Sequence, residues 1–225
     1  MINKKKCLAV IPARGGSRRL KRKNIKEFNG KPLIGWSIIE ALKSKYIDRL
    51  VVSTEDEEIA EIAKSFGASV PYLRPSYLSQ DDVGATEPIL ELLKNFNNYD
   101  QIVLLQPTSP LRLYKDIDAC IKISNQQKGY PCIAVSEVVH DIGVLVTKDI
   151  KNKISLYKNK DNNKVLKING AIYTSSAAIL NKHKTFITNN ALGYEMPIDR
   201  SIDIDTIHEF RLAENYMKSE NNDEF

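Results

Sequence analysis

Short apolar runs alternate with helix-length segments along the first 135 residues of this 225-residue chain. The runs are apolar at nearly every position, which is typical of strands buried on both faces of a parallel sheet. The segments between them repeat apolar residues at helical spacing, so the sequence predicts an α/β fold with a mostly parallel sheet and helices on both faces. The expected strands are 7–11, 50–52, 70–73, 102–105 and 133–135, and the expected helices are about 33–44, 56–66, 88–96, 117–124 and 206–218.

The helix over about 56–66 carries clear signals at both ends. Thr54 and Glu57 have the spacing of a capping box, in which each side chain accepts a hydrogen bond from the other residue's backbone. Gly67 stands where a left-handed residue commonly ends a helix. We therefore expect a helix that starts and stops sharply at these positions.

The pattern changes beyond residue 139 to two short, polar, strand-like pieces, 144–147 and 154–157. With a tight turn expected over 159–163, they predict a β-hairpin inserted at about 139–167 into a single domain spanning residues 1–225. Such a hairpin is too small to have a core of its own, so it should pack on the main domain or on a second subunit, and we favour the second subunit. The chain then returns to the sheet through 170–173.

The net charge of +5 is distributed unevenly. Residues 1–31 hold eleven Lys and Arg against Glu27 alone, so the rest of the chain is mildly acidic. A nucleic-acid-binding protein more often spreads its cations along a face and interleaves aromatic residues. The distribution therefore argues against nucleic acid as the partner, although a basic arm that grips it stays an alternative.

The cysteines and histidines show no metal-ligand spacing. Cys7, Cys120 and Cys132 lie far apart in apolar runs, which predicts buried free thiols in a reducing compartment. The three histidines are isolated from one another and are expected to be structural or solvated. No run is long enough for a membrane span or for the core of a signal peptide, so we expect a cytoplasmic protein without a membrane partner.

A basic, glycine-containing segment follows the first expected strand. Seven Lys and Arg lie between Arg14 and Lys26 without an acid among them, and Gly15 and Gly16 allow close backbone approach to a ligand. The spacing matches neither the P-loop nor the dinucleotide fingerprint. A different polyphosphate-binding loop is therefore expected, with a solvated basic turn as the alternative.

The carboxyl ends of parallel strands form the ligand crevice of an open sheet. Asp203 and Asp205 are expected there, at the end of a last strand over 202–205, where their side chains would share a face and could together hold Mg²⁺. The alternative is that Asp205, or Thr206 with Glu209, only caps the last helix. Capping would leave Asp203 unexplained.

Two further segments belong to the same edge. Pro107 and Pro110 fix the backbone after the fourth strand, so that Gln106, Thr108 and Ser109 offer rigid neutral hydrogen-bonding groups suited to a polyhydroxylated substrate. An ordinary surface turn would explain this segment equally. Arg74, after the third strand, is a candidate for binding phosphate or a base edge, or for holding a surface acid.

Taken in order, these motifs resemble the cytidylyltransferases that activate sialic acids. The motifs are 11–17 with 23–24, 73–75 with 78–81, 106–112, 169–173 and 202–205, and they span nearly the whole chain. The resemblance implies a Rossmann-like fold of the nucleotide-diphospho-sugar transferase type and a homodimer with Mg²⁺ as cofactor. It implies transfer of CMP from CTP to the C2 hydroxyl of a nine-carbon 2-keto acid sugar, such as N-acetylneuraminic, legionaminic or pseudaminic acid, with release of pyrophosphate.

The resemblance also implies roles for individual residues. Nucleotide binding would use Arg14, Gly15, Gly16, Ser17, Lys23, Asn24, Arg74 and Thr86. Acceptor binding would use Gln106, Thr108, Ser109, Lys167, Tyr173 and Phe186, with Phe186 reaching a neighbouring subunit's pocket. Metal binding would use Asp203 and Asp205. Family members often carry Arg where Lys167 stands, which exchanges a bidentate carboxylate partner for a point charge.

The implied reaction is an in-line attack of the sugar hydroxyl on the α-phosphorus of CTP. Mg²⁺ on Asp205, assisted by Asp203, would bridge phosphate oxygens, while Arg14, Lys23 and the Gly15 and Gly16 amides neutralise the leaving pyrophosphate. No general base is evident in the sequence. The nearest alternatives are a cytidylyltransferase for a shorter 2-keto sugar acid and a basic nucleic-acid-binding protein.

Overall fold

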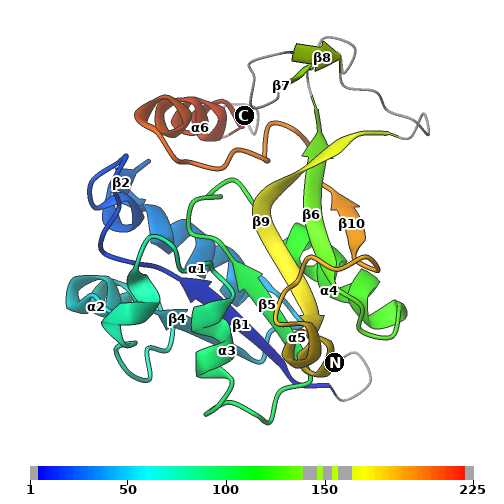
Figure 1. Cartoon of the computed structure of the whole chain (residues 1–225). Coiled ribbons are helices and arrows are strands. Elements are labelled where there is room, and N and C mark those ends of the chain that lie inside the picture. Colours follow the sequence, from blue (N-terminus) through cyan, green and yellow to red (C-terminus); the bar gives the residue numbers. More distant parts are fainter. Residues whose placement is uncertain (1–4, 139–145, 149–153, 157–163, 221–225) are drawn as a thin grey trace.

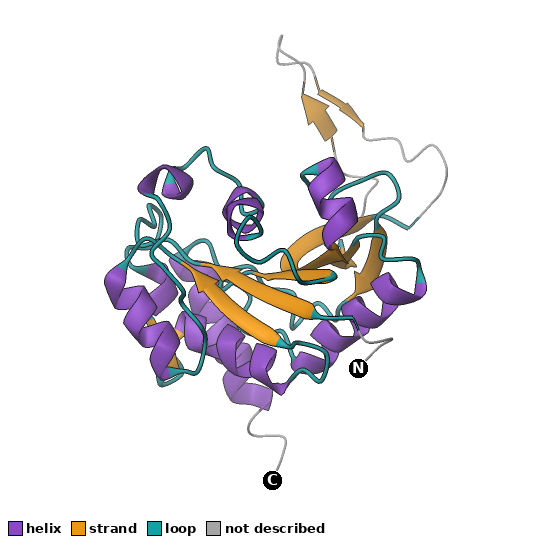
Figure 2. Ribbon diagram, turned by 90° about the horizontal axis from the view of Figure 1, so that it is seen from below, coloured by secondary structure: helices purple, strands orange, loops and turns teal. Residues whose placement is uncertain are grey.

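A six-stranded sheet forms the centre of the computed structural model, which describes residues 5–138, 146–148, 154–156 and 164–220 (Figures 1 and 2). The spatial order of the strands is β10-β6-β9-β5-β1-β4. In chain order they are β1 (Cys7–Pro12), β4 (Arg49–Ser53), β5 (Gln101–Leu105), β6 (Cys132–Glu137), β9 (Leu166–Ser176) and β10 (Leu192–Glu195).

The sheet is parallel except for β9. β1 pairs in parallel with both β4 and β5, and β6 pairs in parallel with β10. β9 runs antiparallel to its two neighbours, β5 and β6. The mostly parallel sheet expected from the sequence is confirmed. Its interior strand β1 is buried along Cys7–Ile11, as the continuous apolar run predicts.

Helices cover both faces of the sheet (Figure 2). One face packs on α1 (Leu33–Lys43), α2 (Glu57–Ser65) and α4 (Tyr114–Gln126), through a cluster that includes Ile38 and Ile121. The other face packs on α3 (Glu87–Leu92) and α5 (Ala177–His183), through a second cluster that includes Ile89 and Leu180. The expectation of helices on both faces is therefore confirmed.

The last helix, α6 (Ile207–Glu220), packs away from the sheet on a small N-terminal ribbon made of β2 (Glu27–Phe28) and β3 (Lys31–Pro32) (Figure 1). The Phe28 and Phe210 rings meet edge to face, with centroids 5.3 Å apart. This apolar contact, together with buried Ile204, brings the chain around residue 205 beside the 3-10 helix η1 (Lys23–Ile25). The fold thereby joins two segments about 180 residues apart in sequence.

Two local expectations need correction, and a third is confirmed. The strand expected over 70–73 is reduced to one bridge between Val51 and Ser69, because the chain turns out of the sheet there. The cap of α2 is Asp56, whose carboxylate accepts from the Ile59 N–H at 3.0 Å, whereas Thr54 Oγ1 accepts from the Asp56 N–H. Gly67 does end this helix with a positive φ of 94°.

The segment expected as an inserted hairpin contains β7 (Val146–Lys148) and β8 (Ile154–Leu156), which pair antiparallel. In both views this ribbon stands away from the main sheet (Figures 1 and 2). The turn expected over 159–163 lies outside the described residues. The insertion ends before residue 166, because Leu166 and Lys167 already pair with Glu137 and Ser136 in the main sheet.

The remaining features follow the composition. All three cysteines are buried and free, as expected. His183 and His208 are exposed, and His140 lies outside the described residues. Within the part of the chain that the structure describes, no helix has both the length and the apolarity of a membrane span. A second 3-10 helix, η2 (Ser76–Ser79), lies in the loop before α3.

Candidate active site

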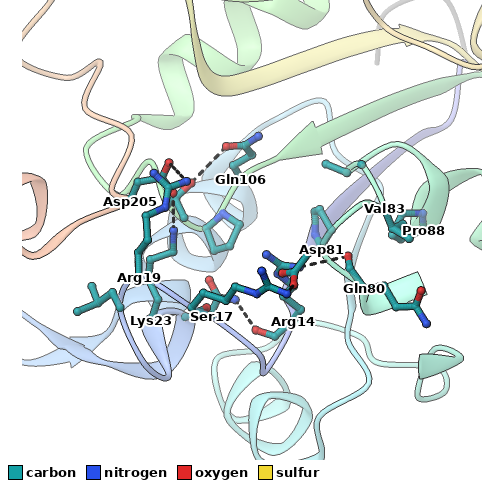
Figure 3. A pocket seen from close by; sticks show the side chains of 18 of the residues that line it. Arg14, Ser17, Arg19, Lys23, Gln80, Asp81, Val83, Pro88, Gln106 and Asp205 are labelled. Carbon is teal, nitrogen blue, oxygen red and sulfur yellow. Dashed lines mark hydrogen bonds and ion pairs between the residues drawn. The ribbon is translucent and has the colours of Figure 1, made fainter. Parts of the chain in front are cut away.

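A cleft of about 600 Å³ opens beyond the carboxyl ends of β1 and β5 (Figure 3). Its walls come from the loop after β1, the segment between α2 and α3, the loop after β5 and the segment before α6. The predicted site residues among its lining are Arg14, Ser17, Lys23, Asn24, Arg74, Gln106, Thr108, Asp203 and Asp205. The segments that the sequence placed at one sheet edge therefore do meet in one cleft.

Basic residues of the first loop contact the acid before α6 directly. Lys23 Nζ lies 3.0 Å from Asp205 Oδ1 and donates to the Ile204 carbonyl at 2.7 Å. Arg19 Nη2 lies 3.0 Å from Asp205 Oδ2, and Figure 3 shows both cations pointing at this carboxylate. Opposite charges from the two ends of the chain thus form one cluster.

The capping alternative holds for Thr206 with Glu209 and not for the Asp205 side chain. The Ile204 N–H donates to the Thr108 carbonyl at 2.8 Å, which fixes the segment against the loop after β5. Glu209 Oε2 accepts from the Asp205 and Thr206 backbone N–H groups, and so caps α6. The Asp205 carboxylate is left to face the cleft.

The two acids differ in protonation behaviour. Burial raises the pKa of Asp203, and the nearby charge of Asp205 adds to this rise. Burial also acts to raise the pKa of Asp205, but the hydrogen bond and charge of Lys23, with the charge of Arg19, outweigh it and lower that pKa. Asp205 is therefore an ionised group, while Asp203 is the member of the pair that holds its proton more tightly.

The opposite wall of the cleft carries an acid that pairs with the same basic loop. Arg14 Nη1 lies 2.9 Å from Asp81 Oδ1, and Arg18 also pairs with Asp81. Arg14 further donates to the Gln80 carbonyl at 3.2 Å. The positive charges of the basic loop are therefore partly neutralised by Asp81 and Asp205, which lie far from the loop in sequence.

The two glycines of the basic loop do not act as the sequence suggested. Neither Gly15 nor Gly16 has a positive φ, and neither lines the cleft. The Gly15 N–H donates to Glu55 Oε1 at 2.8 Å, so it is not turned toward a phosphate. Gly15 is needed for a different reason, because a Cβ there would lie 2.3 Å from Asp56 Oδ2.

The floor of the cleft includes Gln106 and Thr108, and Gly170 lies directly behind Gln106. The Thr108 hydroxyl donates to Gln106 Oε1 at 3.2 Å. Gly170 has a φ of 80°, and a Cβ there would lie 2.9 Å from Gln106 Oε1 and 3.1 Å from Asp203 Oδ2. The absence of a side chain at residue 170 therefore lets an amide and a carboxylate converge on one spot.

A buried arginine holds this floor from below. Arg112 is 1% exposed and donates to the carbonyls of Gln106 and Ala171 at 3.1 and 2.8 Å. It thereby ties the loop after β5 to β9. Ser109 lies in the same buried layer rather than in the cleft, so its expected contact with an acceptor is not supported.

Four other predicted positions lie outside the cleft. Phe186 is 2% exposed and packs on Tyr173, with ring centroids 5.9 Å apart. It lies in the core of its own chain, so the expected contact with a neighbouring subunit's pocket is not supported. Tyr173 does not line the cleft. Burial raises the pKa of its hydroxyl, and the nearby charge of Asp203 adds to this rise. Lys167 is exposed on β9, and Thr86 precedes α3 without lining the cleft.

The site offers two carboxylates for a hard cation. Among the residues that the structure describes, no group of three or more His, Cys, Asp or Glu is placed to hold a metal. Asp203 Oδ1, however, is buried without a hydrogen-bond partner. Since Mg²⁺ commonly takes one or two carboxylates and completes its shell with waters and substrate phosphates, the pair fits such an ion.

Sequence reasoning missed Arg19, Glu55 and Asp81. Arg19 and Asp81 line the cleft, and Glu55 lies behind it. Arg19 belongs to the basic run and Asp81 to the motif over 78–81, but nothing in the sequence shows which cation meets which acid. The assembled cleft presents cations, neutral hydrogen-bonding groups and two acids together, which suits a metal-bound polyphosphate beside a hydroxylated substrate.

The chain is similar to known proteins in both sequence and fold. The profile of the family described as Cytidylyltransferase matches residues 8–222. The chain is 35% identical to the CMP-N,N'-diacetyllegionaminic acid synthase of Legionella pneumophila, with 94% of this chain and 96% of the relative covered. It is 37% identical to the pseudaminic acid cytidylyltransferase of Campylobacter jejuni, with 92% and 94% covered.

A third relative, the N-acylneuraminate cytidylyltransferase of Escherichia coli, is 31% identical over 96% of this chain and 53% of its own length. Among solved structures, a CMP:2-keto-3-deoxy-manno-octonic acid synthetase in complex with CTP superposes with a TM-score of 0.73 at 18% identity, covering 96% of this chain and 99% of that one. A cytidylyltransferase from Leptospira borgpetersenii gives 0.61 at 21% identity, covering 92% and 84%. These two likenesses establish the fold.

Proposed function

The chain belongs to the cytidylyltransferase family and is a nucleotidyltransferase of the CMP-sialic acid synthetase type. From this premise we propose that it transfers CMP from CTP to the C2 hydroxyl of a nine-carbon 2-keto acid sugar. The acceptor class is that of the relatives named for legionaminic, pseudaminic and N-acylneuraminic acids. The observation that carries the proposal is the contact of Lys23 with Asp205 at 3.0 Å inside the shared cleft.

In the proposed reaction the sugar hydroxyl gives up its proton, a new oxygen–phosphorus bond forms at the α-phosphorus, and the bond to the β-phosphate breaks. Arg14, Arg19 and Lys23 lie at the basic wall of the cleft, where they would hold the triphosphate and the departing pyrophosphate. Asn24 supports the assignment, because its Oδ1 is buried without a partner and could accept from a ribose hydroxyl.

We propose Mg²⁺ as the cofactor, held by Asp205 and Asp203. When bound, the ion would polarise phosphate oxygens and offset charge that grows on them during transfer. The unpartnered Asp203 Oδ1 supports this assignment. Burial raises the pKa of Asp203 although the charge of Lys23 opposes the rise, so this carboxylate has room for a further cation.

The direct test is an assay of pyrophosphate release with CTP, Mg²⁺ and each of N-acetylneuraminic, legionaminic and pseudaminic acids. We expect at least one acid to release pyrophosphate in equal amount to the CMP-sugar formed. Reactions without an acceptor, and with a shorter 2-keto sugar acid, serve as controls. Pyrophosphate release that is no greater with the nine-carbon acids than in these controls would contradict the proposed acceptor class.

We further propose that the enzyme is a cytoplasmic homodimer in which the ribbon β7–β8 contacts a second copy. The support is that this ribbon stands away from the main sheet (Figure 1), and that an isolated two-stranded ribbon is marginally stable without packing. The three buried free thiols fit a reducing compartment. Light scattering should give twice the mass of the 25.5 kDa chain at micromolar concentration; a single-chain mass would contradict the dimer.

The floor of the cleft provides a matched mutational test. Gly170→Ala should lower kcat/KM for the acceptor about tenfold, because the new methyl group displaces Gln106 and Asp203. Gly30→Ala is the control, since Gly30 has a similar φ of 77° but nothing within 4 Å of its Cβ position. Both variants should lose about 1–2 kcal/mol of stability from the left-handed backbone. Equal activity losses in the two would mean that only backbone strain matters at residue 170.

A further inference from the structure

Glu55, which follows β4 and lies behind the cleft wall, joins two loops that the proposed function treats separately. Its Oε1 accepts from the Gly15 N–H at 2.8 Å, in the basic loop after β1. Its Oε2 accepts from the Ser79 hydroxyl at 2.6 Å and lies 3.1 Å from Arg74 Nη2, in the loop before α3. One carboxylate therefore contacts the loop expected at the triphosphate and the loop expected at the base.

Arg74 depends on this carboxylate. Its side chain is 5% exposed, and burial lowers its pKa, while the charge and hydrogen bond of Glu55 oppose that shift. Arg74 Nε donates to Ser79 Oγ at 2.8 Å, and Nη1 donates to the Ser53 carbonyl at 3.2 Å. The guanidinium is thus held in one orientation by three partners, of which Glu55 is the only one with a full negative charge.

The orientation of Arg74 bears on which nucleotide fits. A guanidinium has only hydrogen-bond donors. The pairing edge of cytosine presents two neighbouring acceptors, O2 and N3, whereas uracil carries a donor at N3. Because Arg74 lines the cleft, its fixed donors favour a cytosine edge over a uracil edge.

We infer that Glu55 is a positioning residue that sets the base preference of the enzyme by holding Arg74, and that it fixes the Gly15 peptide in the same geometry. This inference rests on the proposed function, since it assumes that CTP occupies the cleft. The absence of a side chain at residue 15 fits this arrangement, because a Cβ there would lie 2.3 Å from Asp56 Oδ2, next to Glu55 in the chain.

The test is Glu55→Gln, measured by calorimetric titration with CTP and with UTP without acceptor, and by initial rates with acceptor. We expect KM for CTP to rise about tenfold and the CTP-to-UTP ratio of kcat/KM to fall about tenfold, with kcat at saturating CTP within about twofold. Glu57→Gln is the matched control, because Glu57 is an exposed acid two residues further along, in the first turn of α2.

A second comparison shows whether Glu55 acts through Arg74. In an Arg74→Met background, Glu55→Gln should leave the CTP-to-UTP ratio unchanged. An equal fall of the ratio in both backgrounds, or a wild-type ratio in the single variant, would overturn the inference. If Glu55→Gln fails to fold, Ser79→Ala removes the hydroxyl that bridges Glu55 and Arg74 and should lower the ratio in the same direction.

The titrations separate this inference from the proposed function. If the wild-type protein prefers CTP over UTP in the titration but releases no pyrophosphate with any nine-carbon acid, the acceptor assignment fails and the role of Glu55 can still be judged. If wild-type protein binds CTP and UTP equally, the role of Arg74 and Glu55 in base preference is refuted.

Discussion

Replacing Asp205 with alanine is expected to lower kcat about a hundredfold or more. The carboxylate meets Lys23 and Arg19 in the cleft and is kept ionised by their charges, so its loss removes the acid that we propose holds Mg²⁺. Loss of one preorganised electrostatic contact of this kind typically costs about 3–4 kcal/mol of transition-state stabilisation. Initial rates of pyrophosphate release over a range of Mg²⁺ concentrations provide the measurement.

The control for this variant is Asp82→Ala, which makes the same change at an exposed acid beside the cleft. The thermal midpoint of Asp205→Ala should stay near that of the wild type, because Glu209 rather than Asp205 caps α6. A variant that folds and retains more than about a tenth of wild-type kcat would refute the proposed role of Asp205.

Lys23→Ala should lower kcat/KM for CTP by about a hundredfold as well. Lys23 has a side chain only 13% exposed, and it holds both the Ile204 carbonyl and the Asp205 carboxylate. Its removal takes away a cation that we propose binds the triphosphate, and it also loosens the acid that faces Lys23. Rates with varied CTP separate a loss of binding from a loss of turnover.

Lys21→Ala is the matched control, since Lys21 is an exposed cation of the same loop. Because Lys23 and Asp205 touch, the double variant should lose less activity than the product of the two single losses. Strictly multiplicative losses would show that the two groups act independently. A Lys23→Ala variant with wild-type activity would contradict the proposed role of the basic loop in the reaction.

The regular part of the fold could be predicted from the sequence because burial on two faces leaves a continuous apolar run. β1, β4, β5 and β6 were found in this way. The strand expected over 70–73 was wrong, since an apolar run next to proline can cover a loop as well as form a strand. β10 and α5 were missed, because they are short and lack a strong pattern.

The sequence could predict which segments meet in the cleft, and the contact between Lys23 and Asp205 confirms that part of the prediction. The strand expected over 202–205 was wrong, because this segment lies outside the sheet. The expected role of Phe186 is not supported, because the sequence alone does not distinguish an aromatic residue that packs in the core from one that contacts a substrate. Glu55 could not be found, because its role lies in contacts with residues 40 positions before it and 24 after it.

The burial of Asp203 has a consequence for the lifetime of the protein. A carboxyl whose pKa is raised above the ordinary value of 3.8 holds its proton more tightly in the folded chain than in the unfolded one, so the free energy of unfolding falls as pH rises through that interval. At neutral pH the empty enzyme carries this penalty continuously. A cation beside Asp203 would remove it, so the loaded enzyme should resist heat and proteolysis better than the idle one, and the supply of nucleotide would help determine how long each molecule survives.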